Sequence, residues 1–147
     1  MLSTFVSDEQ SMLDLGASFA AELRGGDVVY LVGDLGAGKT TLVKGILRGL
    51  GYSGNVTSPT YTLVESYEFA DFVVFHFDLY RLKTPEELEF LGIRDMTGGQ
   101  SVILVEWPDN GRGVLPEADQ LITISYMDDG RTVNIGARNR DRGGLIE

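Results

Sequence analysis

Hydrophobic and polar positions along this chain follow two patterns, one typical of helices and one typical of strands. Between about residues 10 and 24, apolar residues recur at the three- to four-residue spacing of an amphipathic helix, at Met12, Leu15, Phe19 and Leu23. Residues 27–32 and 101–106 are instead short, nearly continuous apolar runs, which are typical of buried strands in parallel sheets. The mixture of the two patterns predicts an α/β domain.

Capping residues indicate where the predicted helices begin and end. The Ser-Asp-Glu-Gln segment that starts at Ser7 has the pattern of a capping box, with Ser7 as N-cap, and Gly25-Gly26 ends this first helix. A second helix is expected over residues 39–50. A third begins at Thr84, the expected N-cap, which is followed by proline and two glutamates.

Segments rich in β-branched and aromatic residues predict additional, antiparallel strands. Residues 61–69 and 72–77 form one expected hairpin, and 121–126 with 131–135 form another at the end of the chain. Residues 2–6 have the pattern of a short edge strand. The expected fold is therefore a parallel core sheet, extended by antiparallel hairpin strands, with helices on both faces.

Length and composition indicate one soluble domain. The 147 residues suit a single hydrophobic core, which we expect to span 1–137, followed by a frayed tail at 138–147. The chain has no cysteine, which excludes disulfides and thiolate metal sites. No apolar run approaches the roughly 20 residues of a membrane-spanning helix, and the start of the chain lacks the pattern of a signal peptide. We expect a cytoplasmic protein without membrane contact.

The charge balance argues against direct binding of nucleic acid. Asp and Glu number 22 and Lys and Arg 12, which gives a formal net charge of −10. Affinity for DNA or RNA comes largely from Lys and Arg that neutralise phosphates. The one basic cluster lies at 138–142, and we prefer to interpret it as a solvated, partly disordered terminus.

The segment between the first buried strand and the second helix is a phosphate-binding loop. It reads Gly33-Asp34-Leu35-Gly36-Ala37-Gly38-Lys39-Thr40 and satisfies the G-x-x-x-x-G-K-[ST] pattern at every position. We call residues 33–40 the phosphate loop. Glycines let successive N–H groups turn towards phosphate oxygens, and the following helix directs its positive dipole end at the same anion. The loop predicts a site for a nucleoside triphosphate and Mg²⁺.

Each residue of the loop has an expected role. The backbone of Gly33, Gly36, Ala37 and Gly38 is expected to wrap the phosphates. Lys39 should reach the β- and γ-phosphates, and the Thr40 hydroxyl should ligate Mg²⁺. Thr41 either contacts the α-phosphate or caps the helix.

Two carboxylates at strand ends are the candidates for the remaining chemistry. Asp78 closes one apolar strand and Glu106 another, and ligands in α/β proteins bind at the carboxyl ends of strands. We assign Glu106 to the magnesium side and Asp78 to the γ-phosphate or its water, although either could simply cap a turn. Thr60 either senses magnesium and the γ-phosphate or belongs to a turn that leads into a strand.

Three further side chains have structural explanations that compete with functional ones. His76 lies within a strand between aromatic residues, so packing with one satisfied hydrogen bond explains it better than catalysis. Trp107 suits an anchor or a ring that faces a partner. Arg81 either stabilises developing phosphate charge or pairs with a nearby carboxylate. For the nucleoside base, Asp8-Glu9 and the hairpin near Arg131 are the candidate contacts.

Beyond the phosphate loop, several segments resemble the TsaE family (also called YjeE), small bacterial P-loop ATPases required to make threonylcarbamoyladenosine in tRNA. The likeness runs from about Ser7 to the terminal hairpin. The phosphate loop alone is shared by many families, but its combination with the other segments, in this order, is specific. The matching segments are 33–41, 58–64, 76–82, 85–95 and the Glu106-Trp107-Pro108 motif.

The resemblance implies a P-loop nucleotide-binding fold, ATP and Mg²⁺ as cofactors, and slow ATP hydrolysis. It implies that Lys39, Thr40 and Thr41 bind phosphate and magnesium and that Asp78 and Glu106 are the functional acids. The implied partners are the transferase subunit TsaD and its companion TsaB, while TsaC makes the activated intermediate. The ATP cycle would reset or license the transferase complex, and tRNA would be met only through that complex.

Three other functions can be weighed against the residues, which argue against the first two. A GTPase would carry an Asn-Lys-x-Asp motif late in the chain, and none is present. A small-molecule kinase would need an acceptor pocket and usually an arginine-bearing lid, which no segment resembles. A nucleotide-gated binding module with negligible turnover is close to the favoured function and differs from it only in rate.

Overall fold

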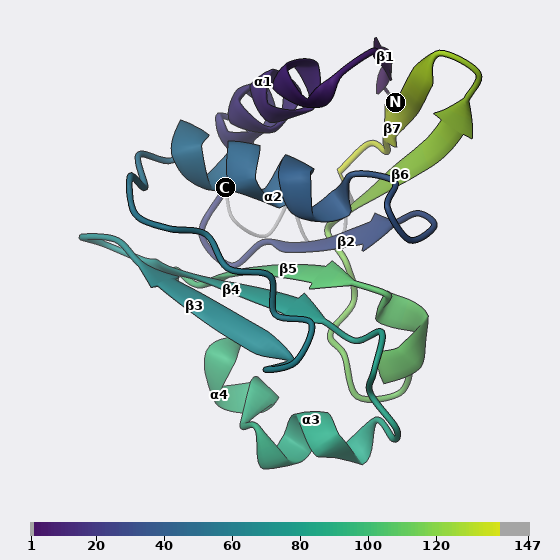
Figure 1. Ribbon diagram of the computed structural model, residues 1–147. Coiled ribbons are helices and arrows are strands. Elements are labelled where there is room, and N and C mark those ends of the chain that lie inside the picture. The colour runs from purple at the N-terminus through teal and green to yellow at the C-terminus, as the bar shows by residue number, and fades with distance from the viewer. Residues whose placement is uncertain (1, 139–147) are drawn as a thin grey trace.

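The computed structural model describes residues 2–138, and within this range the chain forms one seven-stranded mixed sheet (Figure 1). The order of strands across the sheet is β1-β7-β6-β2-β5-β4-β3. The strands are β1 (Leu2–Val6), β2 (Val28–Val32), β3 (Val64–Glu68), β4 (Val73–Asp78), β5 (Val102–Glu106), β6 (Gln120–Met127) and β7 (Gly130–Ile135).

Pairing within the sheet confirms the predicted parallel core with antiparallel additions. Strand β2 pairs in parallel with both β5 and β6, and β4 pairs in parallel with β5. Strands β3, β7 and β1 are added antiparallel at the two sides. In this register Asp78 lies directly beside Glu106. The last residues of two neighbouring strands thus place both candidate acids at one edge of the sheet.

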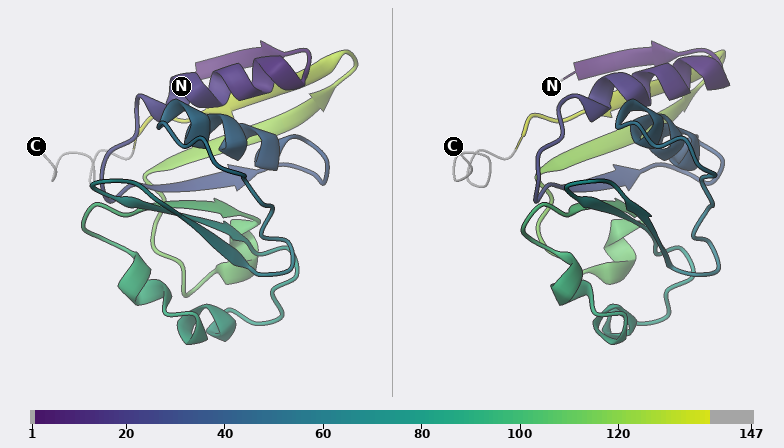
Figure 2. Two further views of the ribbon diagram at one scale, coloured as in Figure 1. Left: turned by 60° about the vertical axis from the view of Figure 1, so that its left-hand side comes forward. Right: turned by 90° about the vertical axis from the view of Figure 1, so that its left-hand side faces the viewer.

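Helices cover both faces of the sheet, as expected (Figure 2). The helices are α1 (Glu9–Ala20), α2 (Lys39–Gly49), α3 (Glu86–Phe90), α4 (Ile93–Met96) and the short 3₁₀ helix η1 (Pro108–Gly111). Alternate residues of each core strand face opposite sides of the sheet: Leu104 packs in the cluster that includes α1 and α2, and Ile103 in the cluster that includes α3 and α4.

Helices α1 and α2 pack with their backbones in close approach. A Cβ atom at Gly45 of α2 would lie 2.3 Å from the carbonyl oxygen of Leu13 in α1, so only glycine fits there. This contact fixes the start of α1 beside the start of α2, where the phosphate loop ends. No helix within residues 2–138 has the length and apolar character needed to cross a membrane.

Two predicted helix starts are wrong by one residue. Asp8, rather than Ser7, is the N-cap of α1: its backbone is extended and its carboxylate accepts the N–H of Ser11 at 2.8 Å. Aspartate caps helices as well as serine does, so the pattern alone could not separate the two. Pro85, rather than Thr84, precedes α3.

Two other elements are shorter in the structure than predicted. Helix α1 ends at Ala20, so Leu23 packs against the core from the turn that follows rather than from the helix. Strand β3 begins at Val64, because residues 60–63 form a turn in which Leu63 has a φ of 70°. That turn brings Thr60 back towards the edge of the sheet.

The beginning of the predicted tail is attached to the domain. Arg138 donates through Nη2 to Oδ2 of Asp27 at 2.9 Å, and Asp27 is fully buried just before β2. The same carboxylate accepts the backbone N–H of Arg24 at 2.7 Å. The remaining tail prediction concerns residues 139–147, which lie outside the described range.

Replacing Arg138 by methionine is expected to lower the free energy of unfolding by about 2–3 kcal/mol, because it leaves the buried Asp27 carboxylate without its cation. Urea denaturation measures the loss. Arg94→Met is the matched control, since Arg94 has 85% of its side chain exposed in its pair with Glu89, and we expect a change below about 1 kcal/mol. Equal losses in the two variants would contradict the assigned role of the buried pair.

Candidate functional site

The phosphate loop crosses from the end of β2 to the first turn of α2. Gly36 and Gly38 have φ values of 77° and 113°, a region that side chains other than glycine rarely adopt. Gly38 is the N-cap of α2. The unpaired N–H groups of the first helical turn therefore begin at the loop itself, which is the arrangement that binds a phosphate at a helix N-terminus.

Lys39 folds back across the loop. Its ammonium group donates to the carbonyl oxygen of Gly33 and, at 3.2 Å, to that of Asp34. The same nitrogen lies 4.2 Å from the centroid of the Trp107 ring. Burial lowers the pKa of Lys39, and the carboxylates of Glu106, Asp78 and Asp34 oppose that shift in this order. The lysine is thus held at the mouth of the loop by weak acceptors that a phosphate oxygen can replace.

Thr40 and Glu106 form the expected magnesium side of the site. The Thr40 hydroxyl donates to Oε2 of Glu106 at 3.0 Å. The same carboxylate oxygen lies 2.7 Å from Nε2 of His76, and both Glu106 and His76 are buried. A hydroxyl and a carboxylate in contact beside a phosphate loop are oxygen donors of the kind that Mg²⁺ prefers. These residues therefore fit the cation that the sequence implies.

Asp78 collects a second set of contacts. The Thr60 hydroxyl donates to Oδ2 of Asp78 at 3.3 Å, and the backbone N–H of Tyr80 donates to Oδ1 at 3.0 Å. Ser58 lies 2.8 Å from the Thr60 hydroxyl oxygen. Burial raises the pKa of Asp78, the Tyr80 N–H opposes this, and the nearby Glu106 carboxylate adds to it. The structure therefore places Thr60 beside Asp78.

The raised pKa of Asp78 predicts a pH-dependent stability difference between the wild type and Asp78→Asn. When the folded pKa lies above the ordinary value of 3.8, the folded chain binds more protons, so stability falls as pH rises between the two values. Asparagine does not titrate. We expect the variant to match the wild type below this interval and to have the higher melting temperature at pH 7, measured calorimetrically. Parallel pH profiles for the two proteins would contradict it.

Most of the predicted site residues meet in one hollow. We call it the phosphate cavity; its volume is about 250 Å³. Of the predicted residues, Gly33 and Ala37 do not line it. Its lining residues are Leu35, Gly36, Gly38, Lys39, Thr40, Thr41, Thr60, Asp78, Glu106 and Trp107.

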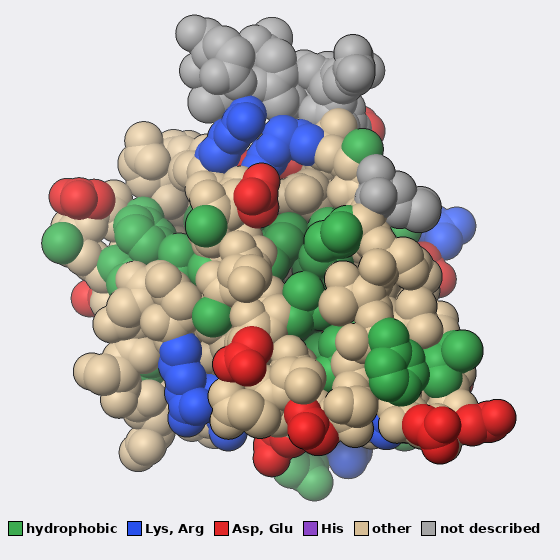
Figure 3. Space-filling view, turned by 90° about the horizontal axis from the view of Figure 1, so that it is seen from above, with side chains coloured by type: hydrophobic (Ala, Val, Ile, Leu, Met, Phe, Trp, Pro, Cys, Tyr) green, Lys and Arg blue, Asp and Glu red, His purple; other side chains and the backbone are tan. Residues whose placement is uncertain are grey.

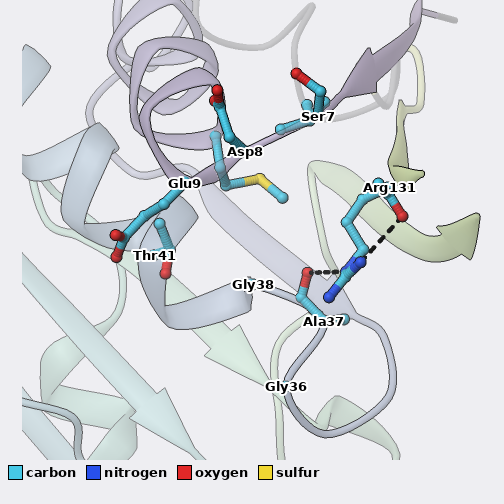
Figure 4. A pocket seen from close by; sticks show the side chains of 11 residues that line it. Ser7, Asp8, Glu9, Gly36, Ala37, Gly38, Thr41 and Arg131 are labelled. Atoms are coloured by element: carbon cyan, nitrogen blue, oxygen red, sulfur yellow. Dashed lines mark hydrogen bonds between the residues drawn. The ribbon is translucent and has the colours of Figure 1, made fainter.

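A second cavity of about 280 Å³ lies on the other side of the loop and shares Gly36, Gly38 and Thr41 with the first. Asp8 and Glu9 border it from the start of α1, and Arg131 borders it from β7 (Figure 4). The Arg131 side chain bends onto the loop and donates through Nε to the carbonyl oxygen of Ala37 at 3.2 Å.

The second cavity also contains residues that the sequence did not single out for function. Val6, Ser7 and Met12 line it. Met12 fitted the helical periodicity of a core residue, and it is indeed buried, with 3% of its surface exposed. No local signal marks these side chains, because the cavity exists only where the start of α1 meets the loop and the terminal hairpin.

Trp107 and Arg81 differ in their relation to the phosphate cavity. Trp107 has a φ of 58°, a strained value for this residue, and its ring lies 5.0 Å from that of Tyr80. It lines the cavity next to Lys39. The Arg81 guanidinium lies 4.7 Å from the Tyr61 ring centroid and does not line the cavity. The structure thus favours Trp107 as part of the site.

Along nearly its whole length, the chain is similar to proteins of one family. A sequence model described as "Threonylcarbamoyl adenosine biosynthesis protein TsaE" matches residues 6–134. The tRNA threonylcarbamoyladenosine biosynthesis protein TsaE of Haemophilus influenzae is 53% identical over 142 residues, covering 93% of this chain and 90% of that protein. The protein of the same name from Bacillus subtilis is 39% identical over 131 residues, covering 88% and 80%.

A solved structure shows the same architecture. The crystal structure of YdiB from Bacillus subtilis aligns with a TM-score of 0.77 and 32% sequence identity. The alignment covers 99% of this chain and 90% of that one. The similarity thus extends from the phosphate loop to the antiparallel strands that complete the sheet.

Proposed function

The chain belongs to the TsaE family of threonylcarbamoyl adenosine biosynthesis proteins, and we propose that it is a magnesium-dependent ATPase that acts on the TsaB–TsaD transferase complex during modification of tRNA. The observation that carries this proposal is the contact between Thr40 and Glu106 inside a cavity that Lys39 also lines. A phosphate loop, its lysine and a hydroxyl–carboxylate pair are together the parts that a P-loop ATPase needs.

The proposed binding mode assigns the phosphates to the phosphate cavity. Backbone N–H groups at the start of α2 bind the anion, and Lys39 leaves the carbonyl oxygens of Gly33 and Asp34 for the β- and γ-phosphates. Thr40 and Glu106 would hold Mg²⁺. When bound with the nucleotide, the cation would supply positive charge to offset the charge that develops on the γ-phosphate.

We assign the nucleoside to the second cavity. The two cavities meet at Gly36, Gly38 and Thr41, so a ligand with phosphates in one reaches directly into the other. Arg131 and the apolar Met12 offer a cation and a packing surface to a base and sugar. ATP is preferred to GTP in this proposal, since the chain lacks the Asn-Lys-x-Asp motif that reads guanine.

Asp78 is assigned to the water that attacks the γ-phosphate. Its carboxylate lies beside Glu106 in the sheet and lines the same cavity, and its raised pKa makes it a better proton acceptor than an ordinary aspartate. Slow turnover is expected of the protein alone. Arg81 packs over the Tyr61 ring, and Arg131 is hydrogen-bonded to the backbone of the loop. Neither arginine is therefore placed to contact the γ-phosphate as an arginine finger.

The surface charge supports a protein partner. With a net charge of −10, the chain is better suited to a protein than to tRNA itself. On the face formed by α1 and β1, acidic side chains are interspersed with the basic ones (Figure 3). We therefore propose that tRNA is met only through the TsaB–TsaD complex.

Nucleotide binding and turnover with and without partners test this function. Calorimetric titration with ATP and with GTP, each with Mg²⁺, is expected to show preferential binding of ATP. Turnover, measured as released phosphate, is expected to be slow for the chain alone and to change when TsaB and TsaD are added. If both turnover and affinity were unaffected by the two partners, the proposed action on the complex would be wrong.

A further inference from the structure

His76 contacts Glu106, and the proposed function gives this contact no role. It lies in β4, pairs with Leu104 of β5, and is fully buried. Its side chain is on the same face of the sheet as Val74, which packs in the cluster with α1 and α2. That face is the one on which α2 and the phosphate loop lie. His76 is therefore behind the phosphate cavity and does not line it.

Only one of the two ring nitrogens of His76 has a partner within residues 2–138. Nε2 lies 2.7 Å from Oε2 of Glu106, whereas Nδ1 is buried without a hydrogen-bond partner. Because a carboxylate accepts hydrogen bonds, Nε2 is the nitrogen that carries the proton. A residue present only to fill space would be expected to be apolar at this position, since a buried nitrogen without a partner costs free energy. The histidine is explained by the bond that it donates to Glu106.

The acceptor of that bond is the atom that also holds Thr40. Oε2 of Glu106 accepts from the Thr40 hydroxyl at 3.0 Å and from His76 at 2.7 Å. The two donors come from different elements, one from α2 and one from β4. Together they fix where the carboxylate lies relative to the threonine hydroxyl.

We propose that His76 is a positioning residue that holds the Glu106 carboxylate against Thr40, so that the pair is arranged for a divalent cation before nucleotide binds. This inference rests on the proposed function, in which Thr40 and Glu106 hold Mg²⁺. His76 does not touch the nucleotide. Donors behind a metal-binding carboxylate typically alter metal affinity or activity by about 10- to 100-fold when removed.

The test is the enhancement of nucleotide affinity by Mg²⁺. A non-hydrolysable ATP analogue is titrated with Mg²⁺ and with EDTA, and the ratio of the two dissociation constants is the enhancement. In His76→Leu we expect this ratio to fall by about 10-fold, with affinity in EDTA unchanged. His76→Gln extends an amide N–H towards the position of Nε2 and is expected to restore most of the enhancement.

Two controls separate positioning from stability. Val74→Ala removes buried volume on the same face of β4 and is expected to lower the melting temperature while leaving the magnesium enhancement as in the wild type. In a Glu106→Gln background, His76→Leu should have no further effect on the enhancement, because the carboxylate through which His76 acts is already replaced.

Specific outcomes would overturn the inference. The inference is wrong if His76→Leu keeps the wild-type magnesium enhancement. It is also wrong if the enhancement falls no further in His76→Leu than in Val74→Ala. Should His76→Leu fail to fold, the comparison passes to His76→Gln and His76→Asn, whose shorter amide does not reach Glu106; equal enhancement in these two would overturn it. Absence of any magnesium enhancement in the wild type would instead refute the proposed function.

Discussion

Replacing Lys39 by alanine is expected to weaken binding of ATP by about 100-fold or more. A hydrogen bond to a charged group contributes about 1.5–3 kcal/mol. Lys39 is assigned to two phosphates, so the combined loss is about 3 kcal/mol or more, which corresponds to about 100-fold in affinity or more. In the free protein the ammonium donates to two carbonyl oxygens and lies over the Trp107 ring. Calorimetric titration with Mg²⁺ and ATP measures the change.

Lys44→Ala is the matched control for Lys39→Ala. Lys44 is on the same helix, is not among the residues that line either cavity, and carries the same charge. Its removal alters the net charge equally, and we expect affinity within about twofold of the wild type, as for surface charges generally. Similar losses in the two variants would mean that overall charge, rather than the loop, governs binding.

Glu106→Gln and Asp78→Asn are each expected to reduce ATP turnover by about 100-fold or more, with a smaller loss of nucleotide affinity. Interactions that strengthen in the transition state contribute on this order. Glutamine at 106 weakens the hold on Mg²⁺, and asparagine at 78 cannot accept the proton of the attacking water. Single-turnover measurements at saturating ATP separate this loss from a loss of binding.

Glu89→Gln is the control for the two acid variants. Glu89 lies on α3 in an exposed pair with Arg94, away from both cavities. The same loss of one carboxylate there is expected to leave turnover unchanged. Wild-type turnover in Glu106→Gln and in Asp78→Asn would refute the roles assigned to them. Asp78→Asn should also be more stable at pH 7 than the wild type, since a buried active-site acid sacrifices stability for activity.

The parts of the site that are contiguous in sequence could be predicted from sequence. The phosphate loop needs only a strand, eight residues and a helix, and each of its residue types has a local physical reason. The strand ends at Asp78 and Glu106 were likewise visible as carboxylates after apolar runs. The sequence did not show that these two carboxylates are adjacent, because their adjacency follows from β4 lying beside β5 in a particular register.

The parts that depend on distant segments could not be predicted in detail. The second cavity joins the start of α1, the phosphate loop and the terminal hairpin, and Met12 fitted the core pattern as well as it fits a cavity wall. The place of His76 in a strand between aromatic residues predicted packing with one hydrogen bond, and the structure agrees. The identity of its partner, Glu106, required the neighbouring strand.

Multiple-turnover modification of tRNA is the measurement that tests the central claim most directly. Purified TsaB, TsaC and TsaD are combined with tRNA, ATP and the substrates of TsaC. The threonylcarbamoyladenosine formed per transferase complex is counted with this chain, without it, and with Lys39→Ala in its place. We predict repeated cycles only with the wild-type chain. Equal product in all three reactions would contradict the claim that ATP bound at this phosphate loop drives the cycle of the transferase.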